Sequence, residues 1–218
     1  MKEDFFVTGT DTNVGKTVLS ALLVAALDGF YWKPIQTGAS EGTDRDAVVG
    51  WAEVPRERTL PERYSYDLPV SPHLAAEAVG ETIDLEHIRR PQPDSSGGSQ
   101  MDLNGPLIVE GAGGVMVPIN WTESMLDLIL QLRLPVVVAS RTAIGTINHT
   151  TLTVNALRDA GANVKGVVMI GRENRDNERS IEQFADVSII GRIPFLETIN
   201  RNSLLQVFQA HFDKQAFR

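Results

Sequence analysis

The residues best suited to chemistry stand near the start of the chain, in the stretch GTDTNVGKT at 9–17. A glycine followed by a lysine and a hydroxyl residue is typical of a loop that binds phosphate. In such a loop the backbone N–H groups enclose the phosphates, the lysine reaches the terminal ones and the hydroxyl binds Mg²⁺. Gly15, Lys16 and Thr17 supply these parts. The sequence therefore predicts a site for a nucleoside triphosphate.

The first glycine of this loop is displaced by one residue. The strict pattern GxxxxGK(S/T) has a glycine where this chain has Thr10, and the glycine here is Gly9. The displacement lengthens the loop but keeps Gly15, which permits close approach of the backbone to phosphate. The alternative, a glycine turn that happens to precede Lys16 and Thr17, is disfavoured because a β-rich run precedes the loop and a helix-forming run follows it.

An acidic candidate follows another apolar run. A phosphoryl-transfer site needs a carboxylate on the Mg²⁺ side, at the end of a neighbouring buried strand. Glu110 ends the run PLIVE at 106–110, and small residues that allow close approach of a ligand come next, namely Gly111, Ala112, Gly113 and Gly114. A solvated strand end is the alternative, but beside a phosphate loop we expect Glu110 to bind the metal ion.

A second cation and further carboxylates come shortly after the loop. The segment KPIQTG places Lys33 and Thr37 at the end of an early strand, and TDRDAVVG supplies Asp44 and Asp46. Lys33 alone fits a solvated strand end equally well. Together, however, these residues exceed what hydrolysis needs. A second lysine suits an enzyme whose nucleophile is itself an anion, because both reacting groups must be neutralised as they meet.

The elements that must position these residues alternate along the chain. Short and nearly continuous apolar runs, as expected for strands buried on both faces, occur at 4–8, 30–34, 106–111, 135–140, 164–170 and 187–194. Helix-forming stretches lie between them, at 17–27, 125–133, 146–161 and 177–185. This alternation predicts an α/β fold of the P-loop NTPase type, with a doubly wound, mainly parallel sheet and helices on both faces.

Length and composition restrict the remaining choices. With 218 residues we expect one domain over 1–218, with a flexible surface loop at about 90–104, where Pro, Ser and Gly are dense. The 20 basic and 28 acidic residues give a net charge of −8 without a basic cluster, so we expect no nucleic-acid partner. No apolar run is long enough to span a membrane, and there is no cysteine. We expect a cytoplasmic protein without a membrane partner.

Several motifs together resemble the dethiobiotin synthetase family. They are FVTGTDTNVGKT, KPIQTG, SPH at 71–73, VEGAGG at 109–114 and GTINHTTLT at 145–153, with GRIP at 191–194 extending the likeness. The displaced glycine is part of that family's pattern. The resemblance implies an ATP- and Mg²⁺-dependent ligase of biotin biosynthesis. Such a ligase uses CO₂ or bicarbonate to close the ureido ring of 7,8-diaminononanoate, by way of a carbamate and a carbamic-phosphoric anhydride.

The resemblance also implies roles for particular residues. Lys33 would hold the carbamate and Lys16 the transferred phosphoryl group. Thr17, Asp46 and Glu110 would hold Mg²⁺. The implied nucleotide contacts are Asn13, Val14, Gly15, Lys16, Thr17, Val18, Asp46, Glu110, Gly111, Ala112, Gly113, Gly171, Pro194, Phe195 and Leu196. The implied substrate contacts are Thr12, Lys33, Thr37, Gly145, Thr146, Ile147 and Asn148.

The stretch from Ile144 to Asn148 precedes a predicted helix, so its free N–H groups suit a carboxylate. In the family this segment receives the substrate's carboxylate tail from the partner subunit. The resemblance therefore implies a homodimer with the substrate site at the subunit interface. We expect His73 and His149 to be structural.

One position departs from the family. Many members end the strand before residue 171 with an Asn-Asp pair whose Asn reads adenine, whereas this chain has Ile170 and Gly171. Ile170 cannot make those hydrogen bonds. The base is then read through the backbone around Pro194, Phe195 and Leu196, by Asn174, or hardly at all. We predict weak selectivity for the base.

The main alternative is a regulatory P-loop ATPase of the partitioning or cell-division type, which the family borders. Such a protein needs a basic surface or a basic amphipathic tail. The C-terminal segment 203–218 is somewhat amphipathic, but its charge is mixed, so we expect a packing helix. A binding module without catalysis is disfavoured because every phosphate and Mg²⁺ candidate is present.

Overall fold

A six-stranded parallel sheet forms the centre of the computed structural model, which describes residues 3–91 and 103–218. The strand order is β2-β5-β1-β6-β7-β8, and every neighbouring pair is parallel. The strands are β1 (Phe5–Gly9), β2 (Phe30–Trp32), β5 (Leu107–Gly114), β6 (Val136–Arg141), β7 (Val164–Ile170) and β8 (Ile189–Ile193). The predicted parallel sheet is therefore confirmed.

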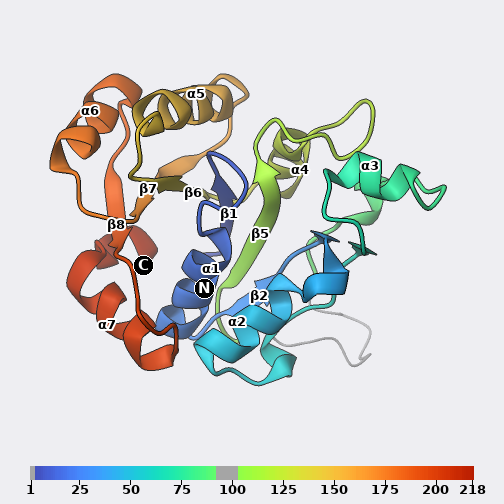
Figure 1. Cartoon of the computed structure of the whole chain (residues 1–218), viewed down its shortest axis with the longest axis horizontal. Coiled ribbons are helices and arrows are strands. Elements are labelled where there is room, and N and C mark those ends of the chain that lie inside the picture. The colour runs from blue at the N-terminus through green and yellow to red at the C-terminus, as the bar shows by residue number, and fades with distance from the viewer. Residues whose placement is uncertain (1–2, 92–102) are drawn as a thin grey trace.

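Helices cover both faces of this sheet (Figure 1). One face carries α1 (Lys16–Leu27), α2 (Asp44–Ala52) and α7 (Arg201–His211). The other carries α3 (Pro72–Glu77), α4 (Met125–Leu132), α5 (Thr146–Asp159) and α6 (Arg175–Ala185). In α7 the side chains of Leu204, Val207 and Phe208 are buried, which confirms that it is a packing helix.

The strands are apolar on both sides because each side meets helices. In β1, Phe5 and Val7 pack in the core with α1, while Phe6 packs in the core on the opposite face. In β6, Val137 packs in the core with α1 and Val138 packs in the core on the opposite face. Since successive side chains of a strand point to opposite faces, a continuous apolar run is what two covered faces require.

Two short strands escaped prediction. β3 (Ile35–Thr37) and β4 (Tyr64–Tyr66) pair in parallel as a separate two-stranded sheet, which lies beyond the end of β2. The remaining described elements are 3₁₀ turns at Ala39–Glu41, Arg56–Arg58, Leu85–His87 and Lys214–Phe217. β3 and β4 are each only three residues long. Runs this short carry little periodicity, so sequence patterns alone do not reveal them.

The flexible loop predicted at 90–104 falls mostly on residues outside those the structure describes. Within the described ranges, no helix has both the length and the apolar character needed to cross a lipid bilayer.

Candidate active site

The phosphate loop leaves β1 at its carboxyl end and leads into α1. Asn13 (φ 56°) and Gly15 (φ 101°) both adopt left-handed backbone conformations, and Gly15 is the N-cap of α1. Gly15 tolerates this conformation because it has no Cβ, and for the same reason no side chain caps the helix. The N–H groups of the first turn of α1 are therefore available to an anion.

Packing explains why the first glycine is Gly9. A Cβ atom added at Gly9 would lie 2.6 Å from Cγ2 of Val14 and 3.0 Å from the backbone oxygen of Asp11. The lengthened loop thus folds back over residue 9, and Val14, which is buried, occupies the space that a side chain there would need.

Lys16 lies inside the loop that its backbone helps to form. Its Nζ donates a hydrogen bond to the backbone oxygen of Asp11 at 3.0 Å. The Asp11 carboxylate pairs with the Arg141 guanidinium at the end of β6, also at 3.0 Å. Burial is the main cause that lowers the pKa of Lys16 to about 8; the Glu110 carboxylate opposes the shift and the Lys33 ammonium adds to it.

Three oxygen atoms converge where a metal ion would be expected. Oγ1 of Thr17 lies 2.9 Å from Oδ1 of Asp44 and 2.9 Å from Oε1 of Glu110. A hydroxyl has one hydrogen, so it can donate to only one of the two carboxylates at a time. A hydroxyl and two carboxylate oxygens are ligands that Mg²⁺ accepts beside nucleotide phosphates. The residues therefore fit a Mg²⁺ ion.

Protein side chains alone do not complete a metal centre here. Among the described residues there is no group of three or more His, Asp or Glu side chains that could hold an ion. A site with two carboxylates is typical of Mg²⁺ that is shared with a nucleotide, because phosphate oxygens and water fill the remaining positions.

Lys33 lies next to both carboxylates, between β2 and β3. Its Nζ pairs with Oδ2 of Asp44 and lies 3.5 Å from Oε1 of Glu110. Burial pulls the pKa of Lys33 downward, but the charges of Glu110 and Asp44 outweigh burial and raise that pKa above its ordinary value. Lys33 is therefore a buried ammonium at neutral pH.

Glu110 lies within β5 rather than at its end, because the strand continues through the small residues to Gly114. Its carboxylate is buried, and Oε2 accepts a hydrogen bond of 3.0 Å from the hydroxyl of Tyr31 on β2. Burial, with the charge of Glu110, raises the pKa of Tyr31, so this phenol remains a neutral donor. Sequence reasoning missed Tyr31, since a tyrosine in an apolar run gives no signal of chemistry.

The prediction that Asp46 lies beside Thr17 and Glu110 at the metal site is wrong. Asp46 is exposed; its carboxylate accepts from Oγ1 of Thr43 at 2.7 Å and pairs with Arg56. The residue beside Thr17 is Asp44, whose backbone N–H donates to Oε1 of Gln36 at 3.1 Å. Two residues correspond to a rotation of about 200° around a helix, so the two aspartates at the start of α2 point in opposite directions.

Gly113 and Gly114 lie beside the phosphate loop, and Gly114 pairs with Gly9, whereas Gly111 meets Phe6 and Met125 in the core. A Cβ atom added at Gly113 would lie 3.6 Å from Oγ1 of Thr12. Thr37 is half-buried at the end of β3, directly after Gln36, whose side-chain oxygen accepts from the N–H of Asp44.

The wall formed by β7 and β8 also meets the phosphate loop. A Cβ atom added at Gly15 would lie 2.9 Å from Cδ1 of Ile170, and one added at Gly171 would lie 3.9 Å from the ring of Phe195. Phe195 is exposed, with Pro194 and Leu196 half-buried on either side. The side-chain oxygen of Asn174 already accepts from the N–H of Asn177 at 3.0 Å, as the cap of α6.

The start of α5 resembles the start of α1. Gly145 (φ 90°) is its N-cap, and no side chain caps it. In the described part of the chain, the N–H of Thr146 bonds to the oxygen of Ala143, whereas those of Ile147 and Asn148 have no partner. Two open donors therefore point away from the first turn of α5.

His73 and His149, which we expect to be structural, each lie against a neighbouring residue. His73 packs edge-on against Trp121, with ring centroids 4.9 Å apart, and His149 stands over Gly145.

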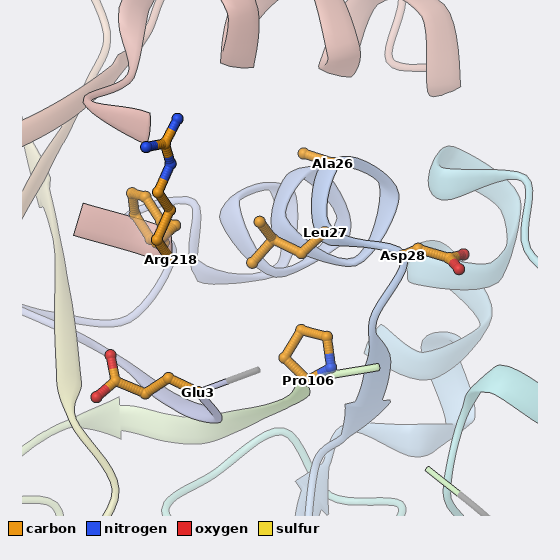
Figure 2. Close-up of a pocket in the computed structure, with 7 residues that line it drawn as sticks. Glu3, Ala26, Leu27, Asp28, Pro106 and Arg218 are labelled. Atoms are coloured by element: carbon orange, nitrogen blue, oxygen red, sulfur yellow. The ribbon is translucent and has the colours of Figure 1, made fainter. Parts of the chain in front are cut away.

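A pocket of about 390 Å³ lies apart from the predicted site residues (Figure 2). Its lining comes from the far ends of α1, β1 and β5 and from the C-terminus, namely Glu3, Ala26, Leu27, Asp28, Pro106, Phe217 and Arg218.

Comparisons with known proteins agree with this geometry. A family profile described as an AAA domain matches residues 3–203. The ATP-dependent dethiobiotin synthetase BioD of Rhodopseudomonas palustris (strain HaA2) is 44% identical over 100% of this chain and 97% of its own length. That of Nitrobacter hamburgensis is 45% identical over 97% of this chain and 95% of its own length.

Solved structures of lower identity show the fold. A ParA family ATPase from Chlorobium tepidum has a TM-score of 0.54 at 11% identity, covering 96% of this chain and 93% of its own. MinD of Aquifex aeolicus has a TM-score of 0.52 at 14% identity, covering 94% and 86%. These likenesses reflect the shared P-loop NTPase architecture, whereas the identities above extend over the whole chain. The chain thus belongs to the ATP-dependent dethiobiotin synthetase family.

Proposed function

We propose that this chain converts 7,8-diaminononanoate, CO₂ and ATP into dethiobiotin, ADP and phosphate. The observation that carries the proposal is the buried ammonium of Lys33, which lies against Asp44 and Glu110 next to the phosphate loop. Plain hydrolysis of ATP needs no such second lysine. An anionic carbamate that attacks a phosphate does, because two negative groups must approach each other.

The steps follow from the chemistry of a diamine. One amine adds to CO₂ and loses a proton to give a carbamate. A carbamate oxygen attacks the γ-phosphorus of ATP, which forms a carbamic-phosphoric anhydride and releases ADP. The second amine then attacks the carbonyl carbon, expels phosphate and closes the ureido ring. Lys33 holds the carbamate, and Lys16 leaves the oxygen of Asp11 to reach the transferred phosphoryl group.

The nucleotide and metal contacts combine the loop with two strands. The N–H groups of residues 13–18 surround the phosphates, residues 110–113 contact the nucleotide, and residues 171 and 194–196 line the side of the base. Thr17, Asp44 and Glu110 would hold Mg²⁺, which neutralises phosphate charge when bound. Asp44 takes the role that was predicted for Asp46. Thr12 and Thr37 contact the diamine or the carbamate.

We also place the substrate's carboxylate on the N–H groups at the start of α5, including those of Ile147 and Asn148. Beside them, Ile144 is fully exposed and Leu152 is 61% exposed. Apolar side chains next to an anion site favour a twofold interface in which one protomer's α5 completes its partner's site. The proposal is therefore a homodimer. We place the protein in the cytosol, a reducing compartment in which proteins do without disulfide bonds, as a chain without cysteine must.

The deciding experiment supplies Mg²⁺, ATP, bicarbonate and 7,8-diaminononanoate and measures dethiobiotin and ADP together. We expect the two products in equal amounts, with ADP formation depending on the diamine. ADP release at the same rate without the diamine would contradict the synthetase function. Omission of bicarbonate in CO₂-free buffer is the matched control.

A further inference from the structure

Three buried hydroxyl groups meet behind the first turn of α5. Oγ of Ser140, on β6, lies 2.9 Å from Oγ1 of Thr146 and 2.7 Å from Oγ1 of Thr150. The two threonine hydroxyls are 3.4 Å apart. None of the three residues is more than 4% exposed. They form a hydroxyl triad, and Oγ of Ser140 also lies 3.4 Å from the backbone oxygen of Arg141.

The triad lies on a face of β6 that is otherwise apolar. Ser140 stands on the same face of β6 as Val136 and Val138, which are core residues, and α5 covers that face with Val154 and Leu157. Apolar side chains of similar shape would hold the helix about as firmly, because a buried hydrogen bond contributes little net stability. Hydroxyl groups add a fixed orientation, since each contact constrains distance and angle.

What the triad orients is the start of α5. Thr146 is the first residue of the helix, directly after Gly145 and directly before the open N–H groups of Ile147 and Asn148. The triad ties this turn to β6, whose residue Ala139 accepts a hydrogen bond of 3.0 Å from the N–H of Thr10 in the phosphate loop. The first turn of α5 is thus fixed to a central strand of the sheet, from which it would serve the active site of the partner protomer in the proposed dimer.

We propose that Ser140 and Thr150, acting through Thr146, are positioning residues for the carboxylate of the substrate. They hold the first turn of α5 so that the N–H groups of Ile147 and Asn148 meet that carboxylate, and they do not touch it themselves. This inference rests on the proposed function. It predicts that the triad affects only the binding of the carboxylate end of the substrate, because the diamine end and ATP bind to other residues.

The test uses paired substitutions and paired substrates. Thr150→Val removes the hydroxyl at nearly constant shape, and Thr150→Ser keeps the hydroxyl but loses the methyl group. Thr153→Val is the control, because Thr153 is buried on the same helix but its hydroxyl has no hydrogen bond among the described residues. The substrates are 7,8-diaminononanoate and nonane-2,3-diamine, in which a methyl group replaces the carboxylate.

We expect Thr150→Val to raise KM for diaminononanoate by about threefold to tenfold, the size of one hydrogen bond. It should leave kcat, KM for ATP and KM for nonane-2,3-diamine unchanged. Thr150→Ser and Thr153→Val should behave like the wild type. If Thr150→Val does not fold, Ser140→Ala provides the same comparison, and we expect the same increase.

Other results would overturn the inference. An equal rise in KM for both diamines, or a fall in kcat alone, would mean a general structural role. Unchanged constants in an active Thr150→Val enzyme would mean no role. A wild-type enzyme that forms no dethiobiotin would instead contradict the proposed function, and this inference would fall with it.

Discussion

Oδ1 of Asp44 lies 2.9 Å from Oγ1 of Thr17, although 27 residues separate them in the chain. Asp46, two residues further on, pairs with Arg56 at the surface. One aspartate therefore belongs to the phosphate site and the other to the capping of α2. Asp44 is partly screened from water, and the Lys33 ammonium holds the pKa of its carboxyl below the ordinary value against the effect of burial.

The two aspartates make a matched pair of substitutions. Asp44→Asn should lower kcat by a factor on the order of 100, as the loss of one charged contact in an active site does. Asp46→Asn should leave kcat nearly unchanged, because the Asp46 carboxylate is exposed and bonded to Thr43 and Arg56. Steady-state dethiobiotin formation at saturating substrates is the measurement. Equal losses in both variants would contradict the assignment.

The two lysines should separate binding from chemistry. Lys33→Ala should abolish dethiobiotin formation and largely spare ADP binding, because Lys33 contacts the carboxylates rather than the phosphate loop. Lys16→Ala should weaken both. Calorimetric titration with ADP and product formation are compared for each variant. Near-normal turnover in Lys33→Ala would refute its role, and Lys33→Arg shows whether charge alone suffices.

The lowered pKa of Lys16 predicts a pH-dependent stability. The pKa is about 8 in the folded chain and 10.5 in the unfolded one, so the unfolded state binds more protons between these values. Stability therefore rises with pH across this window, as the buried ammonium loses its charge. Lys16→Met should be more stable than the wild type at pH 7, and the difference should shrink from about pH 8 to about pH 10.5. Urea unfolding without nucleotide measures this, and a difference independent of pH would contradict it.

Nucleotide selectivity should be weak. Ile170 packs over Gly15 and has no polar side-chain atom, and the side-chain oxygen of Asn174 is already used as the cap of α6. Specificity constants for ATP, GTP and CTP, measured under matched conditions, should lie close together. A preference for ATP above about 100-fold, or about 2.7 kcal/mol, would contradict this. Asn174→Ala is the control and should leave the ratios unchanged.

Much of the fold follows from the sequence because its signals are local. The strands of the large sheet are nearly continuous apolar runs, since both faces are covered, and Gly15, Lys16 and Thr17 stand where a phosphate loop requires them. Glu110 was likewise identified from its place in an apolar run.

The remainder depends on contacts between distant segments. The choice of Asp44 over Asp46 is set by where α2 begins, which Thr43 and Gln36 fix through hydrogen bonds. Tyr31 acquires its role from Glu110, 79 residues away. No local pattern encodes such pairings, because they arise only when the strands lie side by side.

The contact between Gly9 and Val14 has a consequence for how such a loop can change over evolutionary time. Thr10→Gly would restore the strict sequence pattern of the phosphate loop in one step. Gly9 would still be required, because a side chain at position 9 would collide with Val14. Replacing Gly9 with any larger residue requires a smaller residue at 14 and also a shift of the backbone oxygen of Asp11. Gly9 therefore cannot be lost alone, and the two ends of the lengthened loop are inherited as one unit.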